Sequence, residues 1–184
     1  IEAIAPDFCH CLHSLIDTMA NSIFWVDGHG APSGYFHDDA PASLKDFYVR
    51  NFDALFANTA EFSMMAMLGP REPSVGSVLD EAGMRWVRES NVYKYLCAPL
   101  GHHSVIDMRL DHDGQGRAIV ALWREAELPF GPADVALLRG VQDVIQGCFT
   151  PHETQPHWQG LSNRTAHFTT DITGHTLLSI DAEA

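Results

Sequence analysis

The stretch SVIDMRLDHDGQGRAIVALWR (Ser104–Arg124) carries the clearest fold signal in the chain. Its first part, Ser104–Leu110, alternates imperfectly between apolar and polar residues, and its last part, Arg117–Arg124, is the most apolar strand-like run of the sequence. The segment between them, Asp111–Gly116, contains two glycines and predicts a turn. Two strand-like runs around a short glycine-containing turn predict a β-hairpin, so these strands should be antiparallel neighbours in one sheet.

A second hairpin is predicted nearer the beginning of the chain. The run SIFWVD (Ser22–Asp27) is short, apolar and bounded by turn residues, which indicates a buried strand. The GHGAPSG segment that follows is rich in Gly and Pro and predicts a turn. Gly34–His37 is then expected to be the returning strand.

Helical periodicity surrounds the two hairpins. Apolar residues recur at helical spacing in Asp7–Ala20, and Pro132–Phe149 has the most regular stripe of the chain, with Pro132 suited to a first turn. Ser43 is expected to cap a helix that runs to Phe56, in a capping-box-like pair with Asp46. Further helices are predicted at Glu61–Leu68 and at Asp80–Ser90, the latter with another turn through Leu96.

The order helix, hairpin, helices, hairpin, helix predicts an α+β domain over residues 1–149 with one antiparallel sheet, rather than a doubly wound parallel sheet. Residues 150–167 lack periodicity and contain two prolines and several His and Gln, which predicts a linker. Residues 168–184 include the strand-like run HTLLSID. The closing segment HTLLSIDAEA is similar to the opening strand of a PAS-type sensory domain, so this run either starts a further PAS-like module or returns to the first sheet.

Composition limits the classes of protein to consider. The chain has 184 residues, of which 46% are hydrophobic and 19% charged, a composition typical of a globular protein. Its formal net charge of −13 argues against binding to nucleic acid or to an anionic membrane by this chain. No apolar run is long enough to span a bilayer, and no signal peptide is visible. The four cysteines match no disulfide or CxxC pattern, so we expect reduced thiols in a cytoplasmic protein.

The segment SNVYKYLCAPLG (Ser90–Gly101) is similar to a SxxYxxxLxPLG stretch in the N-terminal sensory domains of LuxR-type helix-turn-helix regulators. Three further features match at corresponding places. They are the opening helix with its strand ending at Asp27, the aromatic-rich LKDFYVRNF, and RAIVALWR followed by LPFGPADVALLRGVQDVI. The resemblance covers residues 5–149. It implies a GAF/PAS-like antiparallel sheet flanked by helices.

The resemblance also implies a function. The chain would be a sensory domain that binds an unknown small molecule or partner and signals to a DNA-binding domain outside this chain. In GAF-like domains the small molecule lies between the concave face of the sheet and the helical crossover. The candidate wall residues are aromatic: Trp25, Tyr35, Phe47, Trp86, Tyr93 and Trp123. The alternative for each is plain core packing, since aromatic side chains bury large areas.

Other functions remain open at this point. The helices at 7–20 and 132–149 resemble those that often form the dimer face of GAF-like proteins, so a homodimer is expected. A dimerisation or interaction module without a ligand is the alternative, and a sealed core would favour it. An enzyme that pairs Cys97 with His102 or His103 is a third alternative. We expect no enzyme, because the chain contains no Walker loop, GxSxG elbow or HExxH motif.

Two further groups suggest metal binding. Cys9 and His13 share a helical face and could supply two zinc ligands, but no second pair accompanies them. Asp111 and Asp113 flank His112 in an acidic turn that suggests calcium, yet the EF-hand requires more oxygen ligands. We therefore expect no metal and no cofactor.

Two pairs of basic residues complete the candidates. His102 and His103 are adjacent before a strand, so their side chains should point in opposite directions and at most one should face a pocket. Arg85 and Arg88 flank Trp86 and could hold an anionic ligand. The alternative is that both arginines are exposed on the surface of a helix.

Overall fold

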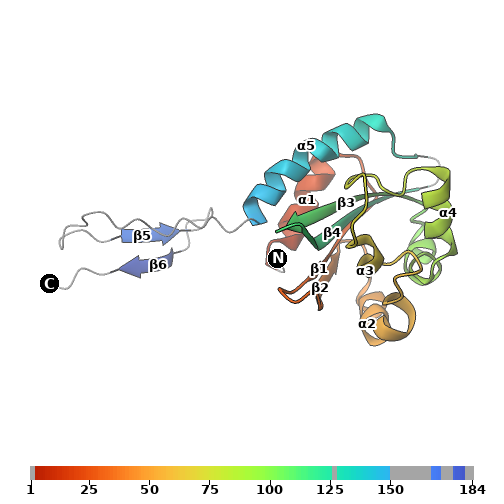
Figure 1. The fold of residues 1–184 in the computed structure, drawn as a ribbon, viewed down its shortest axis with the longest axis horizontal. Coiled ribbons are helices and arrows are strands. Elements are labelled where there is room, and N and C mark those ends of the chain that lie inside the picture. The colour runs from red at the N-terminus through yellow and green to blue at the C-terminus, as the bar shows by residue number, and fades with distance from the viewer. Residues whose placement is uncertain (1–2, 126–127, 150–166, 171–175, 181–184) are drawn as a thin grey trace. The chain divides into compact units, whose positions relative to one another are not determined.

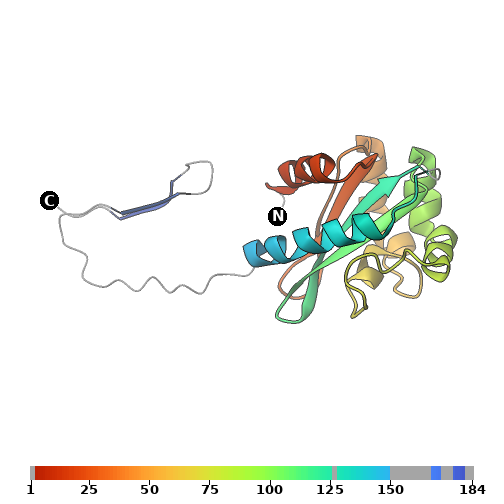
Figure 2. The ribbon, with the colours of Figure 1, turned by 90° about the horizontal axis from the view of Figure 1, so that it is seen from above.

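The computed structural model describes residues 3–125, 128–149, 167–170 and 176–180. The chain divides into two compact units, Ile1–Thr150 and Pro151–Ala184. The first unit is an α+β domain with a four-stranded antiparallel sheet and helices on both faces, as the sequence predicts (Figures 1 and 2). Among the described helices, none is both long enough and apolar enough to cross a membrane.

The sheet has the strand order β2–β1–β4–β3. Its strands are β1 (Ala20–Val26), β2 (Pro32–His37), β3 (Ser104–His112) and β4 (Gln115–Arg124). Both predicted hairpins are formed, and β1 pairs with β4 in the middle of the sheet, where Ala20 lies opposite Trp123 and Trp25 opposite Ala118. The pairing of β1 with β4 joins segments about ninety residues apart and could not be read from local sequence.

The turn between β3 and β4 is shorter than the predicted segment from Asp111 to Gly116. His112 pairs with Gln115, so only Asp113 and Gly114 lie between the strands. Their φ angles are 52° and 72°. Positive φ at both central residues is the requirement of a type I′ turn, whose twist matches that of the flanking strands. The predicted turn is therefore wrong in length, because its outer residues continue the two strands.

Helices α1 (Ala5–Leu15) and α5 (Pro132–Phe149) lie on the same face of the sheet (Figures 1 and 2). The prediction that the first helix extends to Ala20 is wrong. Ile16 is already extended, and the Met19 amide donates to the carbonyl of Trp123 at 2.8 Å. The chain leaves the helix because its main chain pairs with the sheet instead.

The other face carries the crossover between the hairpins. It contains α2 (Ala42–Arg50), the π-helix η1 (Phe52–Phe56), α3 (Met64–Met67), α4 (Glu81–Glu89), the π-helix η2 (Tyr93–Cys97) and the 3₁₀-helix η3 (Ala98–Leu100). The predicted cap at Ser43 is wrong: Pro41 precedes the first turn of α2, and no side chain caps it. Asp80 does cap α4, because its Oδ1 accepts the Gly83 amide at 2.6 Å.

Two hydrophobic cores lie on opposite faces of the sheet. Phe24 and Trp123 belong to the core under α2 and α4, whereas Trp25 and Val120 belong to the core under α1 and α5. Side chains alternate between the faces of a strand, so neighbouring residues of β1 must enter different cores. The indole of Trp25 covers Gly34, which lies opposite it on β2.

The second unit contains β5 (His167–Thr170) and β6 (Thr176–Ile180), which pair with each other in an antiparallel arrangement. The strand predicted in HTLLSID corresponds to β6, and its described partner is β5. The predicted linker, residues 150–167, lies outside the described residues except for His167.

The contact between Trp25 and Gly34 gives a test of this packing. A Cβ at position 34 would overlap ring atoms of Trp25, so Gly34→Ala should lower the free energy of unfolding by about 1–3 kcal/mol. Gly28→Ala is the control because nothing lies within 4 Å of its Cβ, and its change should stay within about 0.5 kcal/mol. Urea denaturation measures both. Equal stability of the two variants would contradict the packing described.

Candidate functional site

The structure brings five of the six predicted wall residues to one side of the sheet. Trp123 lies in the core under α2 and α4, and Tyr35, Phe47, Trp86 and Tyr93 pack against it. Trp25 does not join them, because alternation along β1 turns it to the opposite face. One pocket lined by all six residues is therefore excluded.

The space between the sheet and the crossover is closed. The enclosed cavity there has a volume of about 10 Å³, close to the minimum for a single water molecule. Tyr35 and Trp123 are the predicted residues that line it. The full lining is Ser22, Tyr35, His37, Leu44, Met64, Val92, Leu96, Cys97 and Trp123. No organic ligand fits this cavity without movement of its walls.

The remaining three predicted residues make separate packing contacts. Phe47 packs edge-on against Phe56, with ring centroids 6.1 Å apart. The Trp86 indole donates to the carbonyl of Ala60 at 3.3 Å. The Tyr93 hydroxyl lies 2.7 Å from Nδ1 of His103. None of the three lines the enclosed cavity.

An open pocket of about 380 Å³ lies beside this closed interior, between the β1–β2 hairpin and the helices α2 and η1. Its lining residues are Phe24, Pro32, Ser33, Gly34, Tyr35, Tyr48, Val49, Phe52 and Asp53. Its volume falls within the range of about 300–1,000 Å³ that is usual for small-molecule sites. Tyr35 borders both the open pocket and the enclosed cavity. We call this open pocket the Tyr35 pocket.

Sequence reasoning missed three aromatic residues of the Tyr35 pocket. The signals for them were present: Phe24 alternates with Trp25 on a predicted strand, and Tyr48 and Phe52 stand four residues apart in a predicted helix. What the sequence could not indicate was which face of β1 meets that helix. The rings of Phe24 and Phe52 are stacked at 6.1 Å, and those of Tyr35 and Tyr48 lie 4.6 Å apart.

Tyr48 has an unusual environment in this pocket. Only 3% of the residue is exposed, and its hydroxyl has no hydrogen-bond partner among the described residues. Burial raises the pKa of Tyr48, so the hydroxyl stays protonated. A buried polar group without a partner costs roughly 1–3 kcal/mol, which a ligand that bonds to it would recover.

Behind Tyr35, two histidines and a tryptophan form a buried stack. The His102 ring lies 5.1 Å from that of His37 and 5.7 Å from that of Trp123, nearly parallel to both. Neither ring nitrogen of His102 has a hydrogen-bond partner within the part of the chain that is described, and Oδ2 of Asp39 lies 3.8 Å from its Nε2. Burial lowers the pKa of His102. It also lowers the pKa of His37 to about 4, with a further contribution from His102.

The cysteines and the predicted metal ligands have other roles. Cys9 is buried in the core, which raises the pKa of its thiol to about 12. His13 is engaged at both ring nitrogens, 2.7 Å from Asp38 Oδ2 and 2.8 Å from the Thr18 hydroxyl. Cys97 is buried, and burial raises its pKa, so its thiol is a poor nucleophile at neutral pH. Over the described residues, no three His, Cys, Asp or Glu side chains are placed to hold a metal ion.

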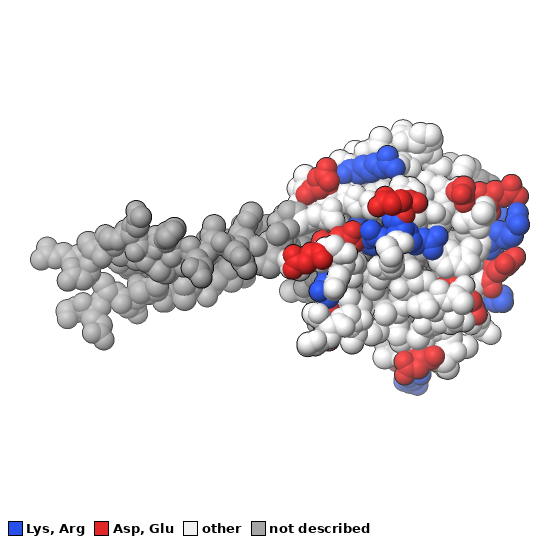
Figure 3. Space-filling view, in the orientation of Figure 1, with Lys and Arg blue, Asp and Glu red and all other residues white. Residues whose placement is uncertain are grey.

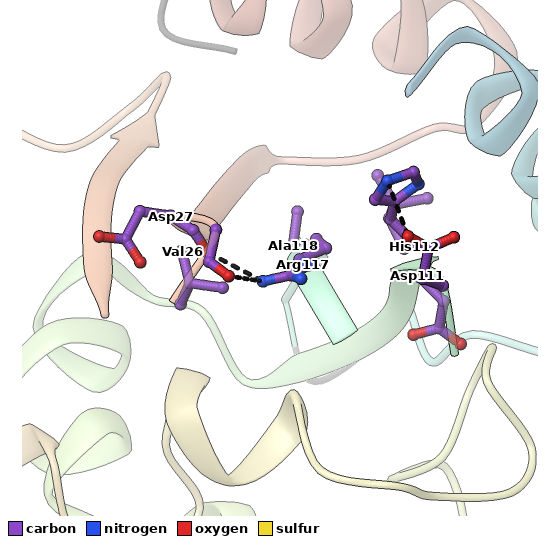
Figure 4. Close-up of a pocket in the computed structure, with 9 residues that line it drawn as sticks. Val26, Asp27, Asp111, His112, Arg117 and Ala118 are labelled. Carbon is purple, nitrogen blue, oxygen red and sulfur yellow. Dashed lines mark hydrogen bonds and ion pairs between the residues drawn. The ribbon is translucent and has the colours of Figure 1, made fainter. Parts of the chain in front are cut away.

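A pocket of about 400 Å³ lies at the ends of the two hairpins, where the acidic turn was considered as a calcium site (Figure 4). Arg117 reaches across it and donates to the carbonyls of Asp27 and Gly28 at 2.9 and 3.2 Å, while the Asp27 carboxylate points away. Asp111 is bound by Arg109 through two hydrogen bonds of 2.7 and 3.0 Å. The Arg117 contacts join the ends of the two hairpins to each other, and the Arg109–Asp111 pair lies within β3.

Comparisons of the chain with protein-family models, with curated proteins and with solved structures found no match.

The buried histidines predict how stability depends on pH. The pKa of His37 is about 4 in the folded chain and 6.5 when unperturbed, so between these values only the unfolded chain is protonated there. The free energy of unfolding should therefore fall as the pH drops from about 6.5 toward 4, by on the order of 3 kcal/mol from His37.

Urea denaturation at about pH 7.5 and about pH 5 measures most of this loss, on the order of 2 kcal/mol at the lower pH. His37→Phe should flatten the dependence while keeping an aromatic ring against His102. His10→Gln, at an exposed position, should leave the dependence as it is in the parent chain. An unchanged pH dependence in His37→Phe would contradict the assignment.

Proposed function

We propose that the chain is the sensory domain of a LuxR-type transcriptional regulator, GAF-like in fold, which binds a small planar molecule in the Tyr35 pocket. The observation that supports this most directly is an open aromatic pocket lined by Tyr48, whose buried hydroxyl has no hydrogen-bond partner among the described residues. A flat apolar compound with one polar group would stack on the aromatic rings and form a hydrogen bond with Tyr48. The output would be a DNA-binding domain outside this chain.

A binding role is favoured over a catalytic one. Cys97, which lines the enclosed cavity, is buried, and burial raises its pKa so that the thiol stays protonated. Charge also favours a domain that contacts DNA only through another module. On the face shown in Figure 3, the Lys and Arg side chains lie beside Asp and Glu side chains and form no continuous basic surface. Together with the net charge of −13, this disfavours contact with a phosphate backbone.

Polar contacts connect the strand that borders the Tyr35 pocket to helix α1 on the opposite face of the sheet. Asp38 follows β2 directly, and its carboxylate accepts the Asn21 amide of β1 at 2.9 Å and contacts His13 of α1 at 2.7 Å. A ligand that displaces Tyr35 on β2 would therefore disturb contacts made three residues further along. Differential binding to two such arrangements is what shifts the population of a sensor.

A second candidate is an interaction module that dimerises without a ligand, and the closed interior favours it. Large apolar side chains are exposed on or beside the two helices of one face. They are Ile4, Leu15, Leu137 and Val144, with 50%, 50%, 42% and 69% of their surfaces exposed. We propose that this face forms a two-fold homodimer, which is compatible with either function.

Indole tests the ligand site. At about ten times its Kd, a ligand of the folded state raises Tm by roughly 3–6 °C for a chain of this size. Val49→Trp should abolish the shift because it fills the mouth of the pocket. Val144→Trp is the matched control, since this valine is also 69% exposed but lies on α5. If indole, phenol and benzoate all fail to shift Tm, the sensor proposal is wrong for planar ligands and the interaction module remains.

The dimer face is tested by introducing a positive charge at an exposed valine within it. Val144→Arg places a cation at the proposed interface twice per dimer and should convert the chain to a monomer in sedimentation equilibrium. Val49→Arg, at an equally exposed valine outside this face, should leave the oligomeric state unchanged. A monomeric parent chain would refute the proposed dimer.

A further inference from the structure

A second cavity lies between α4 and the beginning of β3, and it shares no residue with the Tyr35 pocket. Its volume is about 110 Å³. Its walls are largely apolar and include two basic side chains: the lining is Leu79, Met84, Arg88, His103, Ser104, Pro129 and Phe130. This volume is well below the usual lower bound of about 300 Å³ for small-molecule sites, so it fits a ligand of only a few non-hydrogen atoms.

Arg88 is the distinctive residue of this cavity. Arg85 and Arg88 are both exposed on α4, which is the alternative predicted from the sequence, but only Arg88 lines this cavity. The Arg88 guanidinium has no ion-pair or hydrogen-bond partner among the residues that the structure describes, although the chain has 24 acidic against 11 basic residues. Nearby arginines are paired: Arg85 contacts Glu81 at 3.2 Å, and Arg124 contacts Asp134 at 2.9 and 3.2 Å. An unpaired guanidinium at an apolar cavity provides a fork of donors for a carboxylate.

His103 supplies a second donor. The Tyr93 hydroxyl lies 2.7 Å from its Nδ1. We take the phenol as the donor and Nδ1 as the acceptor, which places the ring proton on Nε2. In that tautomer the Tyr93 hydroxyl orients a side chain that lines the cavity, and Nε2–H can donate to an anion.

We propose that this cavity binds a short-chain monocarboxylate. The carboxylate would accept from Arg88 and from Nε2–H of His103, and a tail of two or three carbons would pack on Met84 and Phe130. The adjoining groove along α4 shares Arg88 but is bordered by Asp80, Glu81 and Glu89. These carboxylates repel a second negative charge, so a single charge is favoured over a phosphate dianion.

The ligand would contact the region where α5 begins. The guanidinium of Arg124 stacks on the Phe130 ring at 4.1 Å and binds Asp134 in the first turn of α5. Asp134 also accepts the Gly131 amide at 2.8 Å. A carboxylate next to Phe130 would therefore lie beside the residue on which Arg124 stacks, and Arg124 in turn binds Asp134 of this helix. The site is independent of the proposed function, because it needs neither the Tyr35 pocket nor a dimer.

The test is a titration of the 184-residue chain with sodium butyrate, followed by ¹H–¹⁵N NMR at constant ionic strength. Saturable shifts at the cavity residues are expected, with a Kd on the order of 1 mM, as befits a ligand of this size. Butyramide, which has the same shape without the charge, should not saturate. Inorganic phosphate should bind more weakly than butyrate.

Variants separate the specific site from general charge effects. Arg88→Gln should weaken butyrate binding by about tenfold or more, because a charge-assisted contact is lost. Arg85→Gln is the matched control on the same helix and should leave the Kd unchanged. Tyr93→Phe should weaken binding less than Arg88→Gln, through loss of the tautomer preference alone. Absence of saturation by butyrate, equal binding of butyramide, or equal losses in the two arginine variants would each overturn the proposal.

Discussion

The antiparallel pairing of β1 with β4 is the constraint from which the rest of the domain follows. It joins the two hairpins into one sheet and aligns Phe24 with Ile119 and Trp25 with Ala118. Because successive side chains of a strand point to opposite faces, this register decides which residues pack under α1 and α5 and which pack under the crossover. A slip of one residue would exchange the two cores.

The register also explains why the interior is closed while a pocket opens at its border. Trp123, Phe56, Phe62 and Met67 are almost fully buried and fill the space between the sheet and the crossover. At β2, the outermost strand on this side, aromatic packing is incomplete, and the Tyr35 pocket lies between that strand and α2. Tyr35 is the boundary, because it packs against the core and lines both the Tyr35 pocket and the enclosed cavity. Three buried polar side chains lie close to this boundary: Tyr48 and His37 pack against Tyr35, and His102 stacks on His37.

Such an arrangement gives one domain two chemically different cavities. The lining of the Tyr35 pocket is rich in aromatic residues, whereas the cavity at α4 combines apolar walls with Arg88 and His103. Each cavity lies near a polar contact with the helices of the opposite face. Asp38, three residues after Tyr35, binds His13 of α1, and Arg124, which stacks on Phe130, binds Asp134 of α5. Helices that are tied to binding surfaces through a few polar contacts can transmit small displacements, since packed cores do not deform continuously.

Much of the fold could be predicted because its signals are local. Both hairpins, the helix beginning at Pro132 and the α+β class follow from alternation, turn residues and helical spacing, which act over a few residues. The limits of α1 and the start of α2 could not, because the chain's pairing with Trp123 and the geometry at Pro41 overrode the local pattern. The candidate site was predicted only in part. Aromatic residues near the crossover were identified, but Phe24, Tyr48 and Phe52 were not.

The sequence by itself therefore determined the α+β class, the two hairpins and the approximate positions of most helices. Only the tertiary structure decided that Trp25 faces away from Tyr35, that Tyr48 lacks a partner, and that Arg88 meets His103 at one cavity. The physical reason is that these facts depend on the pairing of β1 with β4 and on the packing of the crossover. Both join residues far apart in the chain, and no local periodicity encodes such distances.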